Sequence, residues 1–318
     1  MSPREYFNDR IAGLYSKAWS AALLRKVLSR WSSEPWLCSE NEVGVAVNSV
    51  EEALAAVGAI RQRGHHKVVV KEAIGLAGHN ALRLWEPELL EAQRRWLANA
   101  VQHGRQLVVE PWLERELDFS VQLEMSNEGL KLYGYTGLLN DRKGQFQANW
   151  AAANYDRRIP ANITGRFRDP FDFPERIRRL YADVVSLLEE EFREAGFRGP
   201  AGIDAFVYRT PEGGFRVKPI VELNPRYTMG RLTVELMSQV APGSHGLFRL
   251  VSRAMAHAEG FNDFPGYARA LSERFPIRLE GAPRQKIREG AVCLNEPGQA
   301  QACLATFRVS RTLDPLVR

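Results

Sequence analysis

The stretch GPAGIDAFVYRTPEGGFRVKPIVELNPR, residues 199–226, decides how we interpret this chain. Two apolar runs, residues 201–209 and 215–223, flank the turn Thr210-Pro-Glu-Gly-Gly214. Short apolar runs on either side of a Gly-rich turn are typical of a β-hairpin. The stretch therefore predicts two antiparallel strands, and the polar residues near their open ends become candidates for a functional site.

Two acidic residues are expected to face each other in this hairpin. Counting outward from the turn places Asp204 opposite Val221 or Glu222, and Glu222 shares a strand face with Asn224 two residues later. Carboxylates that face each other repel, which is energetically unfavourable, and a divalent cation bound between them removes this repulsion. Hard oxygen ligands suit Mg²⁺ or Mn²⁺. The alternative is that one acid faces solvent and pairs with an arginine, because register can slip by one residue.

Composition bounds the class of protein. The 318 residues are 45% hydrophobic and 25% charged, which favours a globular protein of two or three subdomains. No signal peptide or membrane-spanning run is expected. The three cysteines, Cys38, Cys293 and Cys303, follow no metal spacing and fit a reduced, cytoplasmic setting. The net charge of +5 suits an anionic small ligand, and the lack of an interleaved basic–aromatic motif argues against nucleic acid.

The first 110 residues alternate helices and strands, as in an α/β or α+β domain. Helices are expected over 11–31, from Asn48 onward and over 87–103, and strands over 43–47, 67–71, 81–85 and 107–109.

Strands dominate from Asp118 to Gly137, with a hairpin turn at 127–129. We expect loops over 139–170, an amphipathic helix over 173–196 and a helix over 231–258. The last 60 residues mix short strand-like runs with Gly and Pro.

Lys71 ends an apolar strand just before a loop that contains Gly75 and Gly78. Glycines let backbone N–H groups point inward at an anion, and a neighbouring lysine complements phosphate. The Walker pattern is missing because no Gly-Lys-Ser/Thr follows. The alternative is a solvated lysine at a strand end.

Glu110-Pro-Trp112-Leu113 follows the next apolar strand. Its backbone could hold a flat adenine, with Trp112 and Leu113 near the ring, and Asp118 could accept hydrogen bonds from ribose hydroxyls. The alternative is a core segment with one charged edge residue.

Taken in this order, these pieces resemble the ATP-grasp superfamily, from about Asn8 to Leu236. Lys17, in Tyr-Ser-Lys-Ala-Trp, and Lys71, in Val-Val-Val-Lys, look like the two phosphate lysines of that superfamily. Residues 75–80 resemble its flexible glycine-rich loop, which closes over the phosphates.

The same resemblance makes Glu110, Trp112 and Leu113 the adenine hinge. Asp118 stands where the superfamily usually has a ribose-binding Glu. It further implies that Asp204, Glu222 and Asn224 are the metal ligands, and these three form the most specific of the motifs. Arg226, just after them, is expected to contact the transferring phosphoryl group, with Lys71 assisting.

The resemblance implies an α+β, ATP-grasp fold in which two α+β subdomains grip ATP. The expected division is an N-terminal helical segment (1–36), a small subdomain (37–112), a large subdomain (113–245) and a C-terminal extension (246–318). The α/β domain that usually precedes the first lysine is not recognised. Either the chain is a fragment, or another polypeptide supplies that domain, or the domain is missing. The expected macromolecular partner is a second copy of the chain or a polypeptide that supplies that domain.

The implied function is an ADP-forming ligase that uses ATP and Mg²⁺ or Mn²⁺. It would activate a carboxylate as an acyl phosphate for attack by an amine, a thiol or another nucleophile. Alternatives are a small-molecule kinase on the same fold and a non-catalytic nucleotide-binding protein. Candidates for substrate contact are Tyr227, Arg231 and residues 149–158, and His79 is the one histidine that we would test.

Overall fold

The computed structural model describes residues 7–75, 81–140, 146–153, 155 and 173–312. The chain divides into two compact units. Unit 1 comprises Met1–Asp118, Leu123–Leu132 and Pro160–Arg226, and unit 2 comprises Phe119–Gln122, Tyr133–Ile159 and Tyr227–Arg318. Strands β5 (Glu114–Ser126) and β6 (Gly129–Asn140) contribute residues to both units.

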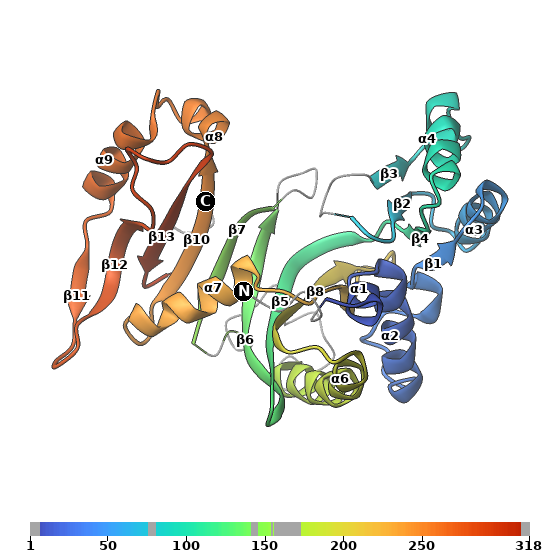
Figure 1. Ribbon diagram of the computed structural model, residues 1–318, viewed down its shortest axis with the longest axis horizontal. Helices are drawn as coiled ribbons and strands as arrows, with labels where there is room; N and C mark the ends of the chain where they lie inside the picture. Colours follow the sequence, from blue (N-terminus) through green and yellow to red (C-terminus); the bar gives the residue numbers. More distant parts are fainter. Residues whose placement is uncertain (1–6, 76–80, 141–145, 154, 156–172, 313–318) are drawn as a thin grey trace. The chain divides into compact units, whose positions relative to one another are not determined.

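Unit 1 contains a four-stranded antiparallel sheet of order β1-β4-β2-β3 (Figure 1). Its strands are β1 (Val45–Val47), β2 (Val68–Glu72), β3 (Ala81–Leu84) and β4 (Leu107–Pro111), and the helices beside it are α3 (Val50–Gln62) and α4 (Glu91–Gln102). Val68 and Val70 are fully buried in a core with residues of both helices. Because side chains alternate along a strand, the opposite face of the sheet presents Lys71 and Glu110 to a pocket.

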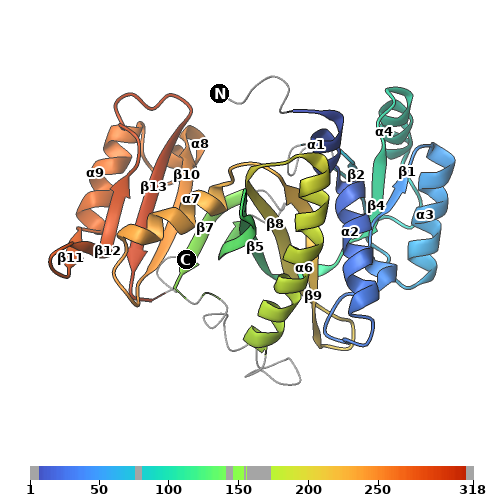
Figure 2. The ribbon, with the colours of Figure 1, turned by 60° about the horizontal axis from the view of Figure 1, so that its bottom comes forward.

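The predicted hairpin forms the second part of unit 1. Strand β8 (Gly199–Arg209) pairs antiparallel with β9 (Phe215–Asn224), and helix α6 (Phe173–Ala195) lies beside them (Figure 2). The apolar stripe predicted for α6 is buried, and its Tyr181 hydroxyl donates to the Pro219 carbonyl of β9 at 2.9 Å. The hairpin and this helix are therefore confirmed.

The N-terminal segment differs from the single helix predicted over 11–31. It consists of α1 (Asp9–Leu14) and α2 (Lys17–Arg30), and a short 3₁₀ turn, η2 (Glu40–Glu42), follows. The break occurs because the Ser16 side chain accepts from the Ala18 backbone N–H at 3.2 Å and so caps a new helix. Lys17 thereby becomes the first residue of α2.

Unit 2 holds strands in the order β11-β12-β13-β10-β7-β6. The elements not yet introduced are β7 (Phe146–Ala152), α7 (Met229–Leu236), η4 (Met237–Gln239), β10 (His245–Ser252), α8 (Arg253–Ala258), α9 (Phe264–Arg274), β11 (Arg278–Glu280), β12 (Lys286–Cys293) and β13 (Cys303–Ser310). Residues of α8 and α9 pack with Val251 and Leu304, whereas residues of α7 pack with Phe248 and Phe307. Two small cores thus use alternate residues of β10 and β13.

Two predictions about unit 2 are wrong. The range of the helix predicted over 231–258 holds four elements, α7, η4, β10 and α8, because Pro242 and Gly243 interrupt the helix and the apolar run after them forms β10. The loop predicted over 139–170 contains strand β7. Pairing with β10 and β6 stabilises this strand, although its residues have only a weak intrinsic preference for β-structure. In both places, pairing between residues distant in sequence overrides the local pattern.

None of the helices in the described ranges is both long enough and apolar enough to cross a membrane. Helices and mainly antiparallel sheets make up both units, so the predicted α+β class is confirmed.

Candidate nucleotide and metal site

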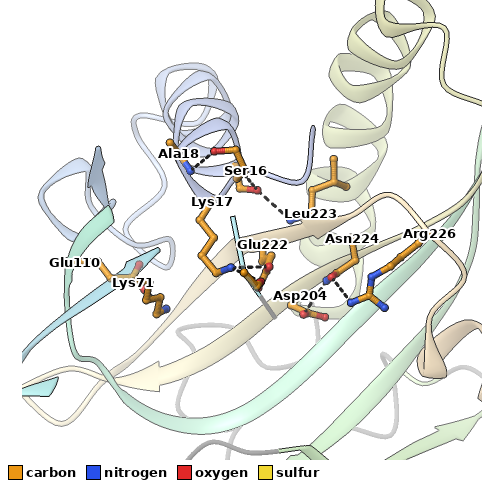
Figure 3. Close-up of polar contacts among 12 residues, drawn as sticks. Ser16, Lys17, Ala18, Lys71, Glu110, Asp204, Glu222, Leu223, Asn224 and Arg226 are labelled. Carbon is orange, nitrogen blue, oxygen red and sulfur yellow. Dashed lines mark hydrogen bonds and ion pairs between the residues drawn. The ribbon is translucent and has the colours of Figure 1, made fainter. Parts of the chain in front are cut away.

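The two predicted acids face each other at the open end of the hairpin. Asp204 pairs in register with Glu222, and Gly202 pairs with Asn224. The Asn224 side-chain N–H donates to Asp204 Oδ2 at 3.0 Å (Figure 3). The three side chains predicted as metal ligands therefore gather on neighbouring strands.

Arg226 extends this group. Its Nη2 donates to Asn224 Oδ1 at 3.0 Å, and its backbone N–H donates to the Asn224 carbonyl at 2.8 Å. We call Asp204, Glu222, Asn224 and Arg226 the hairpin end. Arg226, Asn224 and Asp204 are linked in one chain of hydrogen bonds, from guanidinium to amide to carboxylate.

Lys17 joins helix α2 to the hairpin end. Its Nζ donates to Glu222 Oε1 at 3.0 Å and to the Gly75 carbonyl at 3.1 Å, as Figure 3 shows for the first contact. The Lys17 backbone N–H donates to the Ala73 carbonyl at 2.7 Å. Lys17 therefore connects the segment after β2 with a predicted metal ligand. Gly78 and His79 lie outside the described residues.

Ser20 is a supporting residue that the sequence interpretation missed. Its fully buried hydroxyl accepts from the Leu223 backbone N–H at 3.0 Å, and so fixes the strand between Glu222 and Asn224 against α2. Its position four residues after Ser16, on the apolar side of a helix, is a weak signal that could have singled it out.

Lys71 and Glu110 contact each other on the pocket face of the four-stranded sheet. The Lys71 ammonium donates to Glu110 Oε1. A second lysine, Lys218 of β9, donates to Glu110 Oε2 at 2.8 Å. We call Lys71, Glu110 and Lys218 the buried lysine cluster. Sequence reasoning missed Lys218, because its partner lies 108 residues away and no local motif marks it.

Electrostatics keeps Glu110 ionised. Burial acts to raise the pKa of Glu110, but the charges of Lys218 and Lys71 outweigh it and hold that pKa well below its usual range. Burial lowers the pKa of Lys71, against the opposing charge of Glu110. The cluster therefore holds a carboxylate between two cations.

One pocket of unit 1 is lined by Glu222 of the hairpin end and by all three residues of the buried lysine cluster. It is lined by Lys17, Lys71, Lys218, Glu110 and Glu222, together with Ala21, Leu24, Val43, Gly44, Val108, Ile220 and Val221. Three ammonium groups face two carboxylates there, which leaves an excess of one positive charge. Such a pocket is suited to an anion.

Of the predicted hinge residues, Glu110 lines this pocket, whereas Trp112 and Leu113 do not. The Trp112 backbone N–H donates to the Lys67 carbonyl at 2.9 Å, and the Trp112 ring packs against Arg83 at 5.3 Å. Leu113 is buried, and Asp118 pairs with Arg115 at 3.1 Å. Their roles at adenine and ribose stay predictions.

The residues predicted to contact substrate belong to unit 2. Arg231 Nε pairs with Glu235 Oε1 at 2.7 Å and stacks over the Tyr133 ring at 3.4 Å, and the Tyr227 hydroxyl also contacts Glu235. Asn149 is buried, and residues 154 and 156–158 of that predicted loop lie outside the described residues. Their substrate role stays a prediction.

The hairpin end fits a small divalent cation by its chemistry. Two carboxylates and an amide oxygen are hard donors of the kind that Mg²⁺ prefers. No group of three or more His, Cys, Asp or Glu side chains that could hold a metal occurs in the described part of the chain. That finding is compatible with the predicted set, because its third ligand is Asn224.

Solved structures provide the comparison. The chain is similar to the N5-carboxyaminoimidazole ribonucleotide synthetase PurK in its ADP complex, with a TM-score of 0.57 and 13% identity over 96% of this chain and 70% of that chain. A biotin carboxylase from Campylobacter jejuni gives a TM-score of 0.54 and 11% identity over 95% of this chain and 63% of that chain.

The carboxyaminoimidazole ribonucleotide synthase of Aspergillus clavatus, complexed with ATP, gives a TM-score of 0.53 and 11% identity over 97% of this chain and 71% of that chain. No protein-family model and no curated protein sequence matches this chain. The similar structures are those of ATP-grasp enzymes. Despite the low identity, the chain therefore has the ATP-grasp fold.

Proposed function

We propose that this protein is an ATP- and Mg²⁺-dependent ligase. It activates a carboxylate as an acyl phosphate, which an amine or another nucleophile then attacks, and it releases ADP and phosphate. The observation that carries this proposal is the convergence of Lys17, Lys71 and Glu222 on one pocket of unit 1. The similarity to solved structures of two kinds of ATP-grasp ligase supports it.

In this proposal the lysines bind the phosphates. Lys17 divides its ammonium protons between Glu222 and the Gly75 carbonyl, and an anionic phosphate is a stronger acceptor than a carbonyl. Lys71 lies across the pocket, where the excess positive charge favours a polyphosphate. Gly75 and Gly78 flank the segment that we expect to cradle the phosphates.

Asp204, Glu222 and Asn224 would hold the metal. When bound, Mg²⁺ neutralises charge on the phosphate oxygens and so favours phosphoryl transfer. Arg226 is held by Asn224, and its charge can stabilise the oxygens of the group in transfer. The adenine would lie against the hinge of Glu110, Trp112 and Leu113, and the ribose near Asp118.

The test is a turnover assay with a panel of carboxylic acids, each paired with amines and thiols. We expect both ADP and phosphate to be released with one such pair, and release to require Mg²⁺ or Mn²⁺. ADP formed with a phosphorylated product and no free phosphate would instead identify a kinase. ATP binding without turnover on any pair would indicate a nucleotide-binding protein, and no ATP binding at all would refute the proposal. The matched control is Glu128→Gln, which neutralises an exposed acid in a turn and should behave as wild type.

A further inference from the structure

Lys218 is a buried charge that the proposed function does not use. Its side chain is 3% exposed, and it lies on β9 opposite Phe206. The Lys218 ammonium donates to the Glu42 carbonyl at 3.0 Å and to Glu110 Oε2 at 2.8 Å. A buried ammonium is costly unless it is paired, so these contacts fix both its position and that of Glu110.

Glu110 is shared between two cations. One carboxylate oxygen accepts from Lys71, and the other accepts from Lys218. The side chain of Lys71 is 19% exposed, against 11% for Glu110 and 3% for Lys218, so Lys71 is the member of the cluster most open to the pocket. One negative charge cannot neutralise two positive charges, and the buried lysine cluster therefore carries a net charge of +1.

We infer that Lys218 is a positioning residue for the phosphates of the nucleotide, an inference that rests on the proposed function. By occupying one oxygen of Glu110, Lys218 prevents Glu110 from neutralising Lys71 completely. Part of the positive charge of Lys71 therefore stays uncompensated and can attract an anion in the pocket. Without Lys218, Lys71 and Glu110 would form a closed neutral pair, and the excess positive charge of the pocket would disappear.

A purely structural role makes a different prediction. If Lys218 did no more than compensate Glu110, replacing it would lower stability and leave the affinity for phosphate unchanged. Variants that change the net charge of the cluster and variants that change only its contacts distinguish the positioning role of Lys218 from a purely structural one. Lys218→Met brings the cluster to a net charge of 0, Glu110→Gln brings it to +2, and the double variant returns it to +1.

The experiment measures the binding of inorganic tripolyphosphate by calorimetry. Tripolyphosphate has no base, so any contact of Glu110 with adenine does not affect the result. We expect Lys218→Met to bind it about tenfold more weakly than wild type, as for the loss of one favourable charge interaction. The double variant Glu110→Gln/Lys218→Met should regain the wild-type affinity within about twofold, since it carries the same net charge. Equal affinities of wild type and Lys218→Met, or no recovery in the double variant, would overturn the inference.

Two controls complete the test. Lys131→Met removes an exposed positive charge of unit 1, paired with Glu128 in a turn, and should leave binding unchanged. If Lys218→Met alone does not fold, the double variant is compared with Glu110→Gln, and it should bind about tenfold more weakly because its net charge is lower by one. Equal binding by those two variants would overturn the inference. Failure of the wild type to bind MgATP would refute the proposed function itself, which is a separate outcome.

Discussion

The hairpin end and the buried lysine cluster hold charge in different ways. At the hairpin end, Asp204, Asn224 and Arg226 are linked in a file of hydrogen bonds, and Glu222 is held by Lys17. In the buried lysine cluster, one carboxylate is enclosed by two ammonium groups. The first arrangement offers oxygen atoms that can exchange a partner for a metal ion. The second arrangement holds its three side chains in place and leaves an excess of one positive charge.

This difference separates the expected effects of mutation. Changes at the hairpin end should reduce turnover, because its donors act on the group in transfer. Changes in the buried lysine cluster should reduce stability and alter affinity, which falls when a lysine is lost and rises when Glu110 is neutralised, because its members set the charge of the pocket.

The largest effect is expected at the hairpin end. Glu222→Gln or Asp204→Asn replaces a charged metal ligand with a neutral one of the same size. Metal-dependent ADP release should fall by at least about 100-fold, as when a group that stabilises charge in the transition state is removed. Thermal unfolding should show an intact fold. If either variant retained wild-type turnover, the metal assignment would be wrong.

The next largest effect is expected on the affinity for ATP when Lys71 is replaced. Lys71→Met should weaken ATP binding about tenfold or more, because a charge-assisted contact to phosphate is lost. Burial lowers the pKa of Lys71 from its ordinary 10.5, so wild-type affinity should begin to fall at a pH below that value. Calorimetry at several pH values measures both effects. Lys26→Met, at an exposed lysine of unit 1, is the control, and an unchanged affinity in Lys71→Met would contradict the role of Lys71.

The buried lysine cluster should also contribute to acid stability. The folded-state pKa of Glu110 is depressed, so its contribution is present above its ordinary value of 4.5 and is lost as the pH falls below it. Between about pH 4.5 and about pH 3, the wild type should lose up to about 2 kcal/mol of unfolding free energy through this group. Glu110→Gln should show a shallower dependence in urea titrations over that range. Parallel curves for the two proteins would show that Glu110 is not held ionised.

The smallest effect should come from the support behind the hairpin end. Ser20→Ala leaves the buried Leu223 N–H without its acceptor and should cost about 1–3 kcal/mol of stability. Turnover should fall modestly, because Glu222 and Asn224 flank that residue. Ser29→Ala, at an exposed hydroxyl on the same helix, should change neither quantity. Equal melting temperatures for the two variants would show that the Ser20 contact contributes little.

The hairpin end could be predicted from the sequence because all its parts are local. The turn at 210–214 brings Arg209 opposite Phe215, and a register shift between Asp204 and Phe206 then places Asp204 opposite Glu222, one of the two partners predicted. The amphipathic pattern of α6 was sufficient for the same reason, since it lies within one element.

What the sequence did not reveal depends on distant partners. In the sequence, Lys218 is an ordinary strand residue. Only in the folded chain does it lie next to Glu110 of the four-stranded sheet. The sequence predicts a helix where strand β10 lies, because the pairing of β10 with β7 and β13 has no local signature. The break before Lys17 was missed because Ser16 caps α2 where the helical pattern continues on both sides.

We propose that unit 1 binds ATP together with a divalent metal. A calorimetric titration of the wild-type protein with ATP, first with Mg²⁺ and then with a chelator in place of the metal, tests this most directly. We predict one ATP bound per chain in Mg²⁺ and a large loss of affinity in the chelator. No binding in Mg²⁺, or equal binding with and without the metal, would contradict the claim.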